Sequence, residues 1–139
     1  MKNITQRAIE FRVWDKNTQH FLPIRSPHFG KGYHFNINGT LYDFYSVLEG
    51  HYGNLICQQF TGLSDKNGKK IFEGDIVKLN YDTSDVHWSV LTAEVVWWHN
   101  GFYLQVNKEG CLAQDNYYQF QKCEVIGNVF ETPKLRKKS

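Results

Sequence analysis

The histidines are the first residues to consider for chemistry, because imidazole is the commonest metal ligand and can carry protons near neutral pH. The chain has six of them, and each stands alone in the sequence: His20, His28, His34, His51, His87 and His99. His28, His34 and His51 share one segment and could converge in a fold. Single histidines among aromatic-rich strands are more often packing or surface residues. We therefore expect no metal and no cofactor.

The acidic residues of one turn-rich stretch could form a calcium loop or a catalytic carboxylate pair. An EF-hand loop requires glycine at its sixth position and a bidentate glutamate at its twelfth. Counted from Asp65, Gly68 is fourth and Glu73 is ninth, so the calcium interpretation fails. Glu73 and Asp75 could face another acid across the fold, but an acid-glycine-acid sequence before a strand is well explained by turn capping. We predict structural turns here.

Covalent catalysis is not indicated by the cysteines or serines. Cys57, Cys111 and Cys123 are odd in number and lack CxxC spacing, so each is expected to pack as a small apolar residue. No serine or cysteine stands in a recognisable nucleophile elbow. The glycine-lysine-glycine sequence at residues 30–32 is too short for either nucleotide-binding fingerprint. We expect a protein that is not an enzyme.

Aromatic residues are the one compositional feature that suggests binding. The chain has 10 Phe, 8 Tyr and 4 Trp but a single Met, so much of its packing depends on large flat side chains, which favour strands. An exposed tryptophan beside a tyrosine can stack on a base, grip an extended peptide or bury against a second subunit. Trp88, Trp98 and Tyr103 are the candidate binding residues.

Trp97 and Trp98 must face opposite sides of a strand, because successive side chains alternate. Trp97 shares its face with Ala93 and Val95, which are small and apolar, so we predict that Trp97 lies in the core. Trp98 shares a mixed face with Glu94 and should reach an outer surface. That surface could bind a partner or a second subunit, or it could be covered by the N-terminal part of the chain.

These residues are carried by strands that the alternation of apolar and polar side chains predicts. The chain should turn at residues 65–68 (Asp-Lys-Asn-Gly), bury an apolar step at 71–72, turn again at 73–75 and continue as a strand over 76–79. Residues 43–48 could form one helical turn or more strand. Further strands are expected at residues 9–13, 20–22, 35–37, 40–42, 55–57, 92–98, 102–106 and 123–130. The Asp-Lys-Asn-Thr sequence at residues 15–18 should turn the first of these strands into the second, and residues 99–101 should join 92–98 to 102–106 as a hairpin.

Two polar segments, residues 81–89 and 107–116, are predicted as loops, and the first should be the most mobile part of the chain. Asp82, Asp85 and His87 in the first segment could be drawn as a metal site, but acidic loops that face water are far commoner.

Glycine and proline mark where the strands should turn, bulge and end. Asn38-Gly39 is a predicted hairpin tip. Gly127 should mark a bulge or a close backbone approach in the last strand. Pro133 should end that strand, because proline has no N–H to donate to a strand ladder.

Charge and hydropathy indicate the compartment and the partners. Sixteen Lys and Arg against 14 Asp and Glu give a formal charge of +2, too small to indicate nucleic-acid binding, which depends on clustered cations. The basic cluster at residues 134–138 is expected to be a solvated tail. The N-terminus lacks the apolar core of a signal peptide, and no stretch approaches the ~18 apolar residues of a membrane span. We expect a cytoplasmic protein that does not enter membranes.

Three sequence blocks resemble the YopX family of phage and prophage proteins. They are FRVWDKNTQHF at residues 11–21, TGLSDKNGKKIFEGDIVKL at 61–79 and CEVIGNVFETPKL at 123–135, and they occur in the family's order. The resemblance implies a mostly β protein with an SH3-type barrel in its C-terminal part, carried on phage genomes and without an established biochemical function. Residues 22–55 match nothing recognisable.

The fold we predict is mainly β, with an N-terminal β-hairpin lobe and irregular segment over residues 1–54, an SH3-like barrel over 55–131 and a basic tail over 132–139. The function that the resemblance implies is that of a phage or prophage accessory protein of unestablished biochemical role, in the cytoplasm of a bacterial host. As an interaction module it would bind a protein partner or itself. Weak nucleic-acid binding is the alternative.

Overall fold

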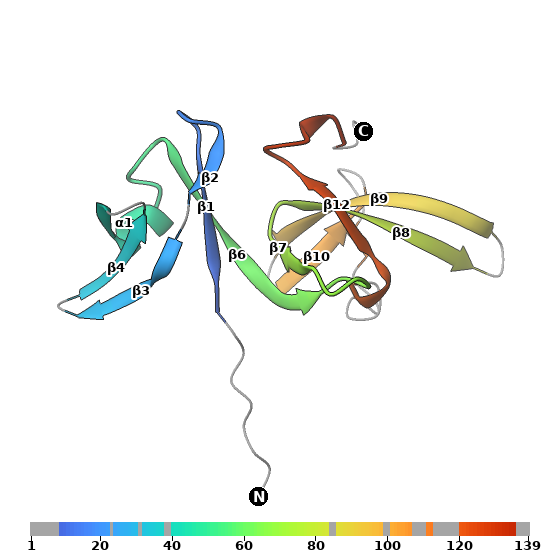
Figure 1. Cartoon of the computed structure of the whole chain (residues 1–139). Helices are drawn as coiled ribbons and strands as arrows, with labels where there is room; N and C mark the ends of the chain where they lie inside the picture. Colours follow the sequence, from blue (N-terminus) through green and yellow to red (C-terminus); the bar gives the residue numbers. More distant parts are fainter. Residues whose placement is uncertain are drawn as a thin grey trace, which may run out of the picture. The chain divides into compact units, whose positions relative to one another are not determined.

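The protein is described from a computed structural model, which confirms that the chain is mainly β (Figure 1). The structure describes residues 9–22, 24–30, 32–37, 40–83, 86–98, 101–106, 111–112 and 120–135, with the backbone alone at 24–30, 32–37, 44, 80–83, 86–90 and 111–112. The chain divides into two units, one formed by Ile9–Gln59 and the other by the residues from Phe60 onward. The division falls within a single long strand, β6 (Leu55–Ser64).

The N-terminal unit opens with the predicted hairpin, β1 (Phe11–Asp15) and β2 (His20–Leu22). The first half of β6 pairs with the other edge of β1, so that Val13 lies opposite both Leu22 and Cys57. The turn is held by Asp15, whose Oδ1 accepts from the backbone N–H of Asn17 at 3.0 Å. The predicted Asp-Lys-Asn turn chemistry is therefore what closes this hairpin.

A second sheet in the same unit contains β3 (Ile24–Gly30), β4 (Gly32–Ile37) and β5 (Thr40–Asp43). Ile37 pairs with Thr40, which confirms the two predicted arms, while the predicted tip at Asn38-Gly39 lies outside the described residues. Helix α1 (Phe44–Leu48) follows, so the segment left open by the sequence is one helical turn. Asp43 ends the strand and caps the helix, since its side chain accepts from the N–H of Ser46 at 3.0 Å.

Among the side chains that the structure describes, one core cluster of the N-terminal unit is formed by three buried residues and the side chains packed on them: Val13, Val47 and Leu55, with Phe11, Leu22, Tyr42, Tyr52 and Cys57. Val47 is the contribution of α1, and it is almost fully buried. The helical turn therefore exists because it places one apolar residue against the hairpin core.

In the C-terminal unit, the second half of β6 pairs with β7 (Lys70–Phe72) across the predicted turn at residues 65–68. Gly68 has φ +83°, and the N–H of Gly68 donates to the Asp65 carbonyl at 3.0 Å. Ile71 is fully buried, as predicted for the apolar step. Gly74 follows with φ +84°, so the second predicted turn is also confirmed and requires a residue that tolerates the left-handed region.

The unit is completed by a five-stranded antiparallel sheet with the order β11-β10-β9-β8-β12. Its strands are β8 (Asp75–Thr83), β9 (Val86–Trp98), β10 (Gly101–Gln105), β11 (Cys111–Leu112) and β12 (Glu124–Asn128). The predicted hairpin of β9 and β10 is confirmed, with Leu104 opposite Val95. The SH3-like character of the sheet and the predicted boundaries 1–54, 55–131 and 132–139 stay predictions.

The predicted loop over residues 81–89 was wrong, and the predicted loop over 107–116 was wrong at residues 111–112, the part of that segment that the structure describes. In place of a loop over residues 81–89, β8 and β9 pair as far as Thr83 and Val86, and only residues 84–85 lie between them. β11 lies within the other segment and pairs with the end of β10. Polar side chains are tolerated in paired strands when one face is solvated, so composition alone misjudged these segments.

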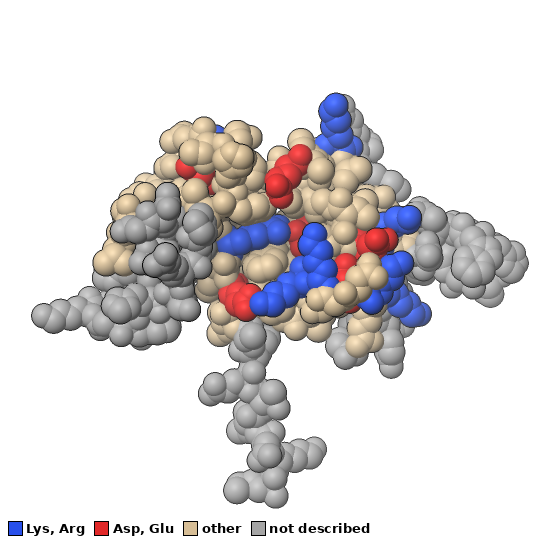
Figure 2. Space-filling view, in the orientation of Figure 1, with Lys and Arg blue, Asp and Glu red and all other residues tan. Residues whose placement is uncertain are grey.

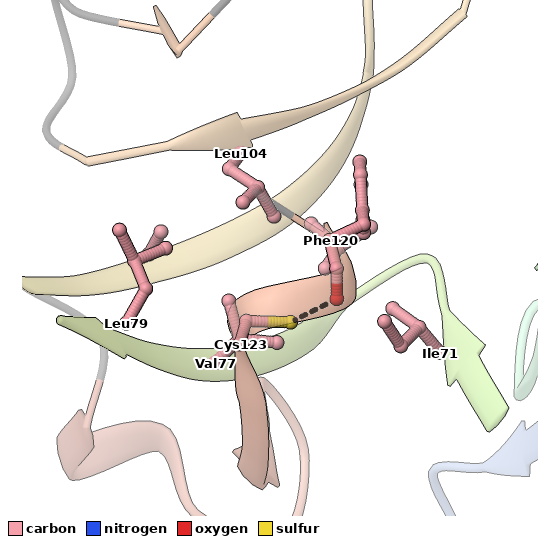
Figure 3. Packing of buried hydrophobic residues seen from close by; sticks show 8 residues of the cluster. Ile71, Val77, Leu79, Leu104, Phe120 and Cys123 are labelled. Carbon is pink, nitrogen blue, oxygen red and sulfur yellow. Dashed lines mark hydrogen bonds between the residues drawn. The ribbon is translucent and has the colours of Figure 1, made fainter. Parts of the chain in front are cut away.

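The core of the C-terminal unit lies against one face of this sheet (Figure 3). Its fully buried members come from β7, β8, β9, β10 and the segment before β12: Ile71, Val77, Leu79, Ala93, Val95, Leu104, Phe120 and Cys123. The Cys123 thiol donates to the Phe120 carbonyl at 3.1 Å. Burial, with the nearby Asp65 charge, raises the pKa of Cys123 to about 12. Cys123 is thus the small apolar core residue that was predicted, and its thiol is protonated at neutral pH.

Strand β12 carries the predicted bulge, because its register with β8 shifts between Val125 and Gly127. A Cβ atom at residue 127 would collide with the Thr132 hydroxyl, so glycine is required for the chain to fold back here. The strand ends at Asn128, earlier than predicted. Asn128 Oδ1 accepts from the N–H of Phe130 and of Glu131, so a side-chain cap ends the strand before Pro133, which instead begins the 3-10 helix η1 (Pro133–Leu135).

Candidate interaction site

The end of the β9–β10 hairpin projects past the strands that cover the rest of β9. Strand β8 pairs with β9 from Ile76, which lies opposite Glu94, and the Gly74 N–H donates to the Val95 carbonyl at 2.8 Å. Beyond Val95, the strand that pairs with β9 within the described ranges is β10. The last residues of β9 therefore belong to a two-stranded ribbon.

Trp97 lies on the core-side face of this ribbon and is 54% exposed, so the prediction that it is a core residue was wrong. It does share a face with Ala93 and Val95, which are 2% and 0% exposed. Trp97 is on the same face but lies beyond the buried core, because the pairing of β9 with β8 stops at Glu94, one residue before Val95. Trp97 instead packs its ring edge-on against Phe102 of β10, with centroids 5.0 Å apart and planes at 75°.

Trp98 lies on the opposite face and is 46% exposed, as alternation predicted. Its ring packs against Tyr103, with centroids 5.4 Å apart and planes at 81°. The two aromatic pairs have the same construction, since each tryptophan of β9 is held in a T-shaped contact by a ring of β10. We call these four residues, Trp97, Trp98, Phe102 and Tyr103, the aromatic end.

The structure brings together two of the three predicted binding residues. Trp98 and Tyr103 are in contact. Trp88 stands ten positions earlier on β9, which corresponds to about 33 Å of extended strand, and its side chain is not described. The predicted binding role of these residues stays a prediction. The contact between Trp97 and Phe102 was not predicted. The sequence could have indicated it, because two adjacent tryptophans lie across a short hairpin from Phe102 and Tyr103.

The chemistry available at the aromatic end is that of an apolar surface with aromatic faces. No charged residue lies in residues 95–98 or 101–104. Such a surface offers π faces to apolar, aromatic or cationic groups and one phenol and two indoles as hydrogen-bonding groups. None of its four residues is a histidine, cysteine, aspartate or glutamate, the side chains that most often ligate metals or act as bases.

Titratable groups buried elsewhere in the unit hold the backbone. Asp65 Oδ1 accepts from the N–H of Asn67 and of Lys69, and Oδ2 accepts from the N–H of Val125, each at 2.9 Å. Asp75 Oδ2 accepts from the N–H of Phe72 at 2.8 Å. Among the residues whose side chains the structure describes, no group of three histidine, cysteine, aspartate or glutamate residues could hold a metal ion. The side chains of Asp82, Asp85 and His87, drawn as a possible metal site, are not among those described.

A second set of exposed apolar side chains occurs in the N-terminal unit and was not predicted. Leu41 is 56%, Tyr45 58% and Leu48 43% exposed. They come from β5 and α1.

In the part of the chain that the structure describes, no helix is both long and apolar enough to cross a membrane.

Comparison with known proteins gives a family and a fold. A family model described as YopX protein matches residues 10–137. Protein EF1440 from Enterococcus faecalis has a similar solved structure, with TM-score 0.61, 21% identity and coverage of 95% of this chain and 100% of that chain. Protein yopX from Bacillus subtilis has TM-score 0.52, 21% identity and coverage of 93% of this chain and 96% of that chain. No curated protein matches the chain.

Proposed function

This chain belongs to the YopX protein family, and from that premise we propose that it is a non-enzymatic interaction module whose aromatic end binds an extended segment of a protein partner. The family resemblance supports a role as an accessory protein of a phage or prophage, acting in the cytoplasm of the bacterial host. The observation that carries the proposal is the pair of half-exposed tryptophans at the aromatic end.

Exposed tryptophans are unfavourable in water and are the residues most enriched at binding hot spots. Here both rings are already held by T-shaped contacts, at 5.0 and 5.4 Å. A side chain that is held before binding loses little conformational entropy when a partner arrives. The aromatic end therefore has both the surface and the order that a recognition site needs.

The shape of the site favours an extended segment as its ligand. The two aromatic pairs lie on opposite faces of a two-stranded ribbon, so a flat protein surface could cover one face but not both. An extended peptide, whose side chains alternate, can follow a strand edge and place residues on either face. The non-enzymatic part of the proposal is supported by the use of Asp65, Asp75 and Cys123 in holding turns and core.

The proposal can be tested with a displayed library of extended peptides selected on the purified full chain. Selected peptides should be rich in apolar and aromatic residues. We expect Trp98→Ala and Trp97→Ala each to weaken their binding by roughly 30-fold or more, since truncating a hot-spot tryptophan costs ~2 kcal/mol or more. Fluorescence anisotropy of labelled peptides measures this.

Tyr45→Ala is the matched control, because Tyr45 is also an exposed aromatic residue, 58% exposed, but belongs to the other unit. It should leave peptide binding unchanged. Selected peptides that bind all three variants as well as the original protein would exclude the aromatic end as the site. If sedimentation velocity shows a dimer that Trp98→Ala dissociates, the occupant is a second copy, and the extended-peptide proposal is wrong.

A further inference from the structure

Exposed lysines gather where the β6–β7 turn meets the segment before β12. Lys66, Lys69 and Lys70 are exposed in and after the turn. The Lys66 N–H donates to the Cys123 carbonyl at 3.0 Å, which places the turn beside exposed Lys122. Figure 2 shows basic side chains gathered over this part of the unit. With Lys78 of β8, these residues form what we call the basic patch: Lys66, Lys69, Lys70, Lys78 and Lys122.

The carboxylates next to the basic patch offset only part of its charge. Asp65 is buried and interacts with the charge of Lys69, while its oxygens accept from three backbone N–H groups. Glu124 lies opposite Lys78 in the register of β12 and β8, and its Oε2 lies 3.8 Å from Lys66 Nζ. The patch therefore keeps an excess of positive charge although the whole chain carries only +2.

We propose that the basic patch binds the phosphate backbone of nucleic acid without reading its sequence. The proposal is independent of the peptide site, because it rests on a different surface and a different chemistry. Phosphate contacts need only cations that can adjust to the backbone, and lysine supplies these as mobile point charges.

An acidic protein is a poorer match to the same surface. Protein interfaces are depleted of lysine at their centre and depend on a buried apolar anchor. The apolar residues under the basic patch are already used, since Phe60 is 6% and Ile71 0% exposed. Lys70 Nζ lies 5.5 Å from the Phe60 ring, so the ring supports the cation from below and offers no anchor to a partner.

The test is the salt dependence of binding to a labelled DNA duplex of arbitrary sequence, measured by fluorescence anisotropy on the full chain. The logarithm of the association constant should fall linearly with the logarithm of salt between about 50 and 200 mM, by ~0.9 per phosphate neutralised. Lys66→Gln with Lys69→Gln should reduce the magnitude of that slope by ~2 and weaken binding at least tenfold at the lower salt concentration.

The control is the double variant Lys16→Gln with Lys134→Gln, which removes the same net charge. Lys16 is the exposed lysine of the corresponding Asp-Lys-Asn turn in the other unit, and Lys134 lies in η1, beyond the opposite end of β12. This variant should keep the original slope. A second double variant, Lys70→Gln with Lys122→Gln, should reproduce the loss, and thermal melts of all variants show that each is folded.

Several results would overturn the proposal. The original protein could show no salt-dependent binding, or the control variant could lose as much of the salt slope as the Lys66 and Lys69 variant. Binding could also be lost when residues 136–139 are removed but kept in the Lys66 and Lys69 variant. Displacement of DNA by polyglutamate at equal charge concentration would also count against it, because an acidic polypeptide would then fit the patch as well as phosphate does.

Discussion

At the scale of single residues, Asp15 and Asp65 perform the same structural task in the two units. Each begins an Asp-Lys-Asn turn, and each also binds a segment far away in sequence. Asn54 Nδ2 donates to Asp15 Oδ1 at 3.0 Å, and the Val125 N–H donates to Asp65 Oδ2 at 2.9 Å. A carboxylate suits this task because it can accept several hydrogen bonds at once.

These bonds predict how stability depends on acid. Burial by itself raises the pKa of Asp65, but the N–H groups of Val125, Lys69 and Asn67 outweigh it and hold the pKa below the usual 3.8. A carboxylate whose pKa is lowered in the folded state stabilises the fold at pH values above its unfolded-state pKa. This stabilisation is lost as the pH falls through the pKa of the folded state. We therefore expect the free energy of unfolding to decrease as the pH is lowered from about 4.

Asp65→Asn tests the assignment to this side chain. The variant should be less stable than the original protein at pH 7, because an amide offers an N–H₂ group where one of the N–H donors needs an acceptor. It should also lose less of its remaining stability between pH 7 and pH 3, because it no longer has a carboxylate to protonate. Urea unfolding at the two pH values measures both effects. The prediction would be contradicted if the variant lost as much stability between pH 7 and pH 3 as the original protein does.

Gly74 carries the second residue-scale prediction. It is buried, has φ +84° and connects β9 to the chain after β12, donating to the Val95 carbonyl and accepting from the Val129 N–H. A side chain in the left-handed region costs about 1–2 kcal/mol, so Gly74→Ala should lower the thermal midpoint by several degrees. Gly53→Ala is the control, since no atom lies within 4 Å of a Cβ at that residue and its φ is not positive. Equal midpoints for the two variants would contradict the strain argument.

At the scale of elements, the β9–β10 hairpin shows why alternation alone misplaced Trp97. Alternation gives the face of a side chain, but burial depends on which neighbouring strands reach that position. Val95 is fully buried because Gly74 and the start of β8 lie beside it, whereas Trp97 lies beyond them. That register is a tertiary property.

The same element yields a stability prediction. Leu104→Ala, at a fully buried site opposite Val95, should lower the free energy of unfolding by ~2–5 kcal/mol. Trp97→Ala should cost clearly less, because the ring is 54% exposed and loses mainly its contact with Phe102. Chemical denaturation of the two variants compares them. A Trp97→Ala protein as unstable as Leu104→Ala would mean that the ring is buried in solution.

Local turn chemistry was the part of the fold that the sequence predicted best. The turns at Asp15, Asp65 and Gly74 depend on one or two residues with special backbone or capping properties, and these are visible in sequence. The pairing of β8 with β9 beyond residue 80 was missed because nothing local separates a polar strand from a loop. Of the candidate site, the exposure of Trp98 and its closeness to Tyr103 followed from alternation and a short hairpin, whereas the exposure of Trp97 depended on where β8 begins.

At the scale of the whole molecule, β6 joins two units that have separate cores. Leu55 packs in the core of the N-terminal unit. Phe60, five residues later on the same strand, packs against Phe72 of β7, with ring centroids 5.5 Å apart. The two core clusters have no residue in common. A unit with its own core can open without the other, provided that the break occurs within the shared strand.

Hydrogen exchange of a core variant tests this independence. Val13→Ala removes two methyl groups from a fully buried position in the N-terminal core and should weaken that unit by ~2 kcal/mol. Exchange should accelerate by roughly 30-fold in β1, β2 and residues 55–59 of β6, and remain unchanged in β8, β9 and β10. Leu104→Ala should produce the reverse pattern, since Leu104 belongs to the other core. If either variant accelerated exchange equally in both units, the chain would open as one cooperative body, and β6 would transmit the loss of one core to the other.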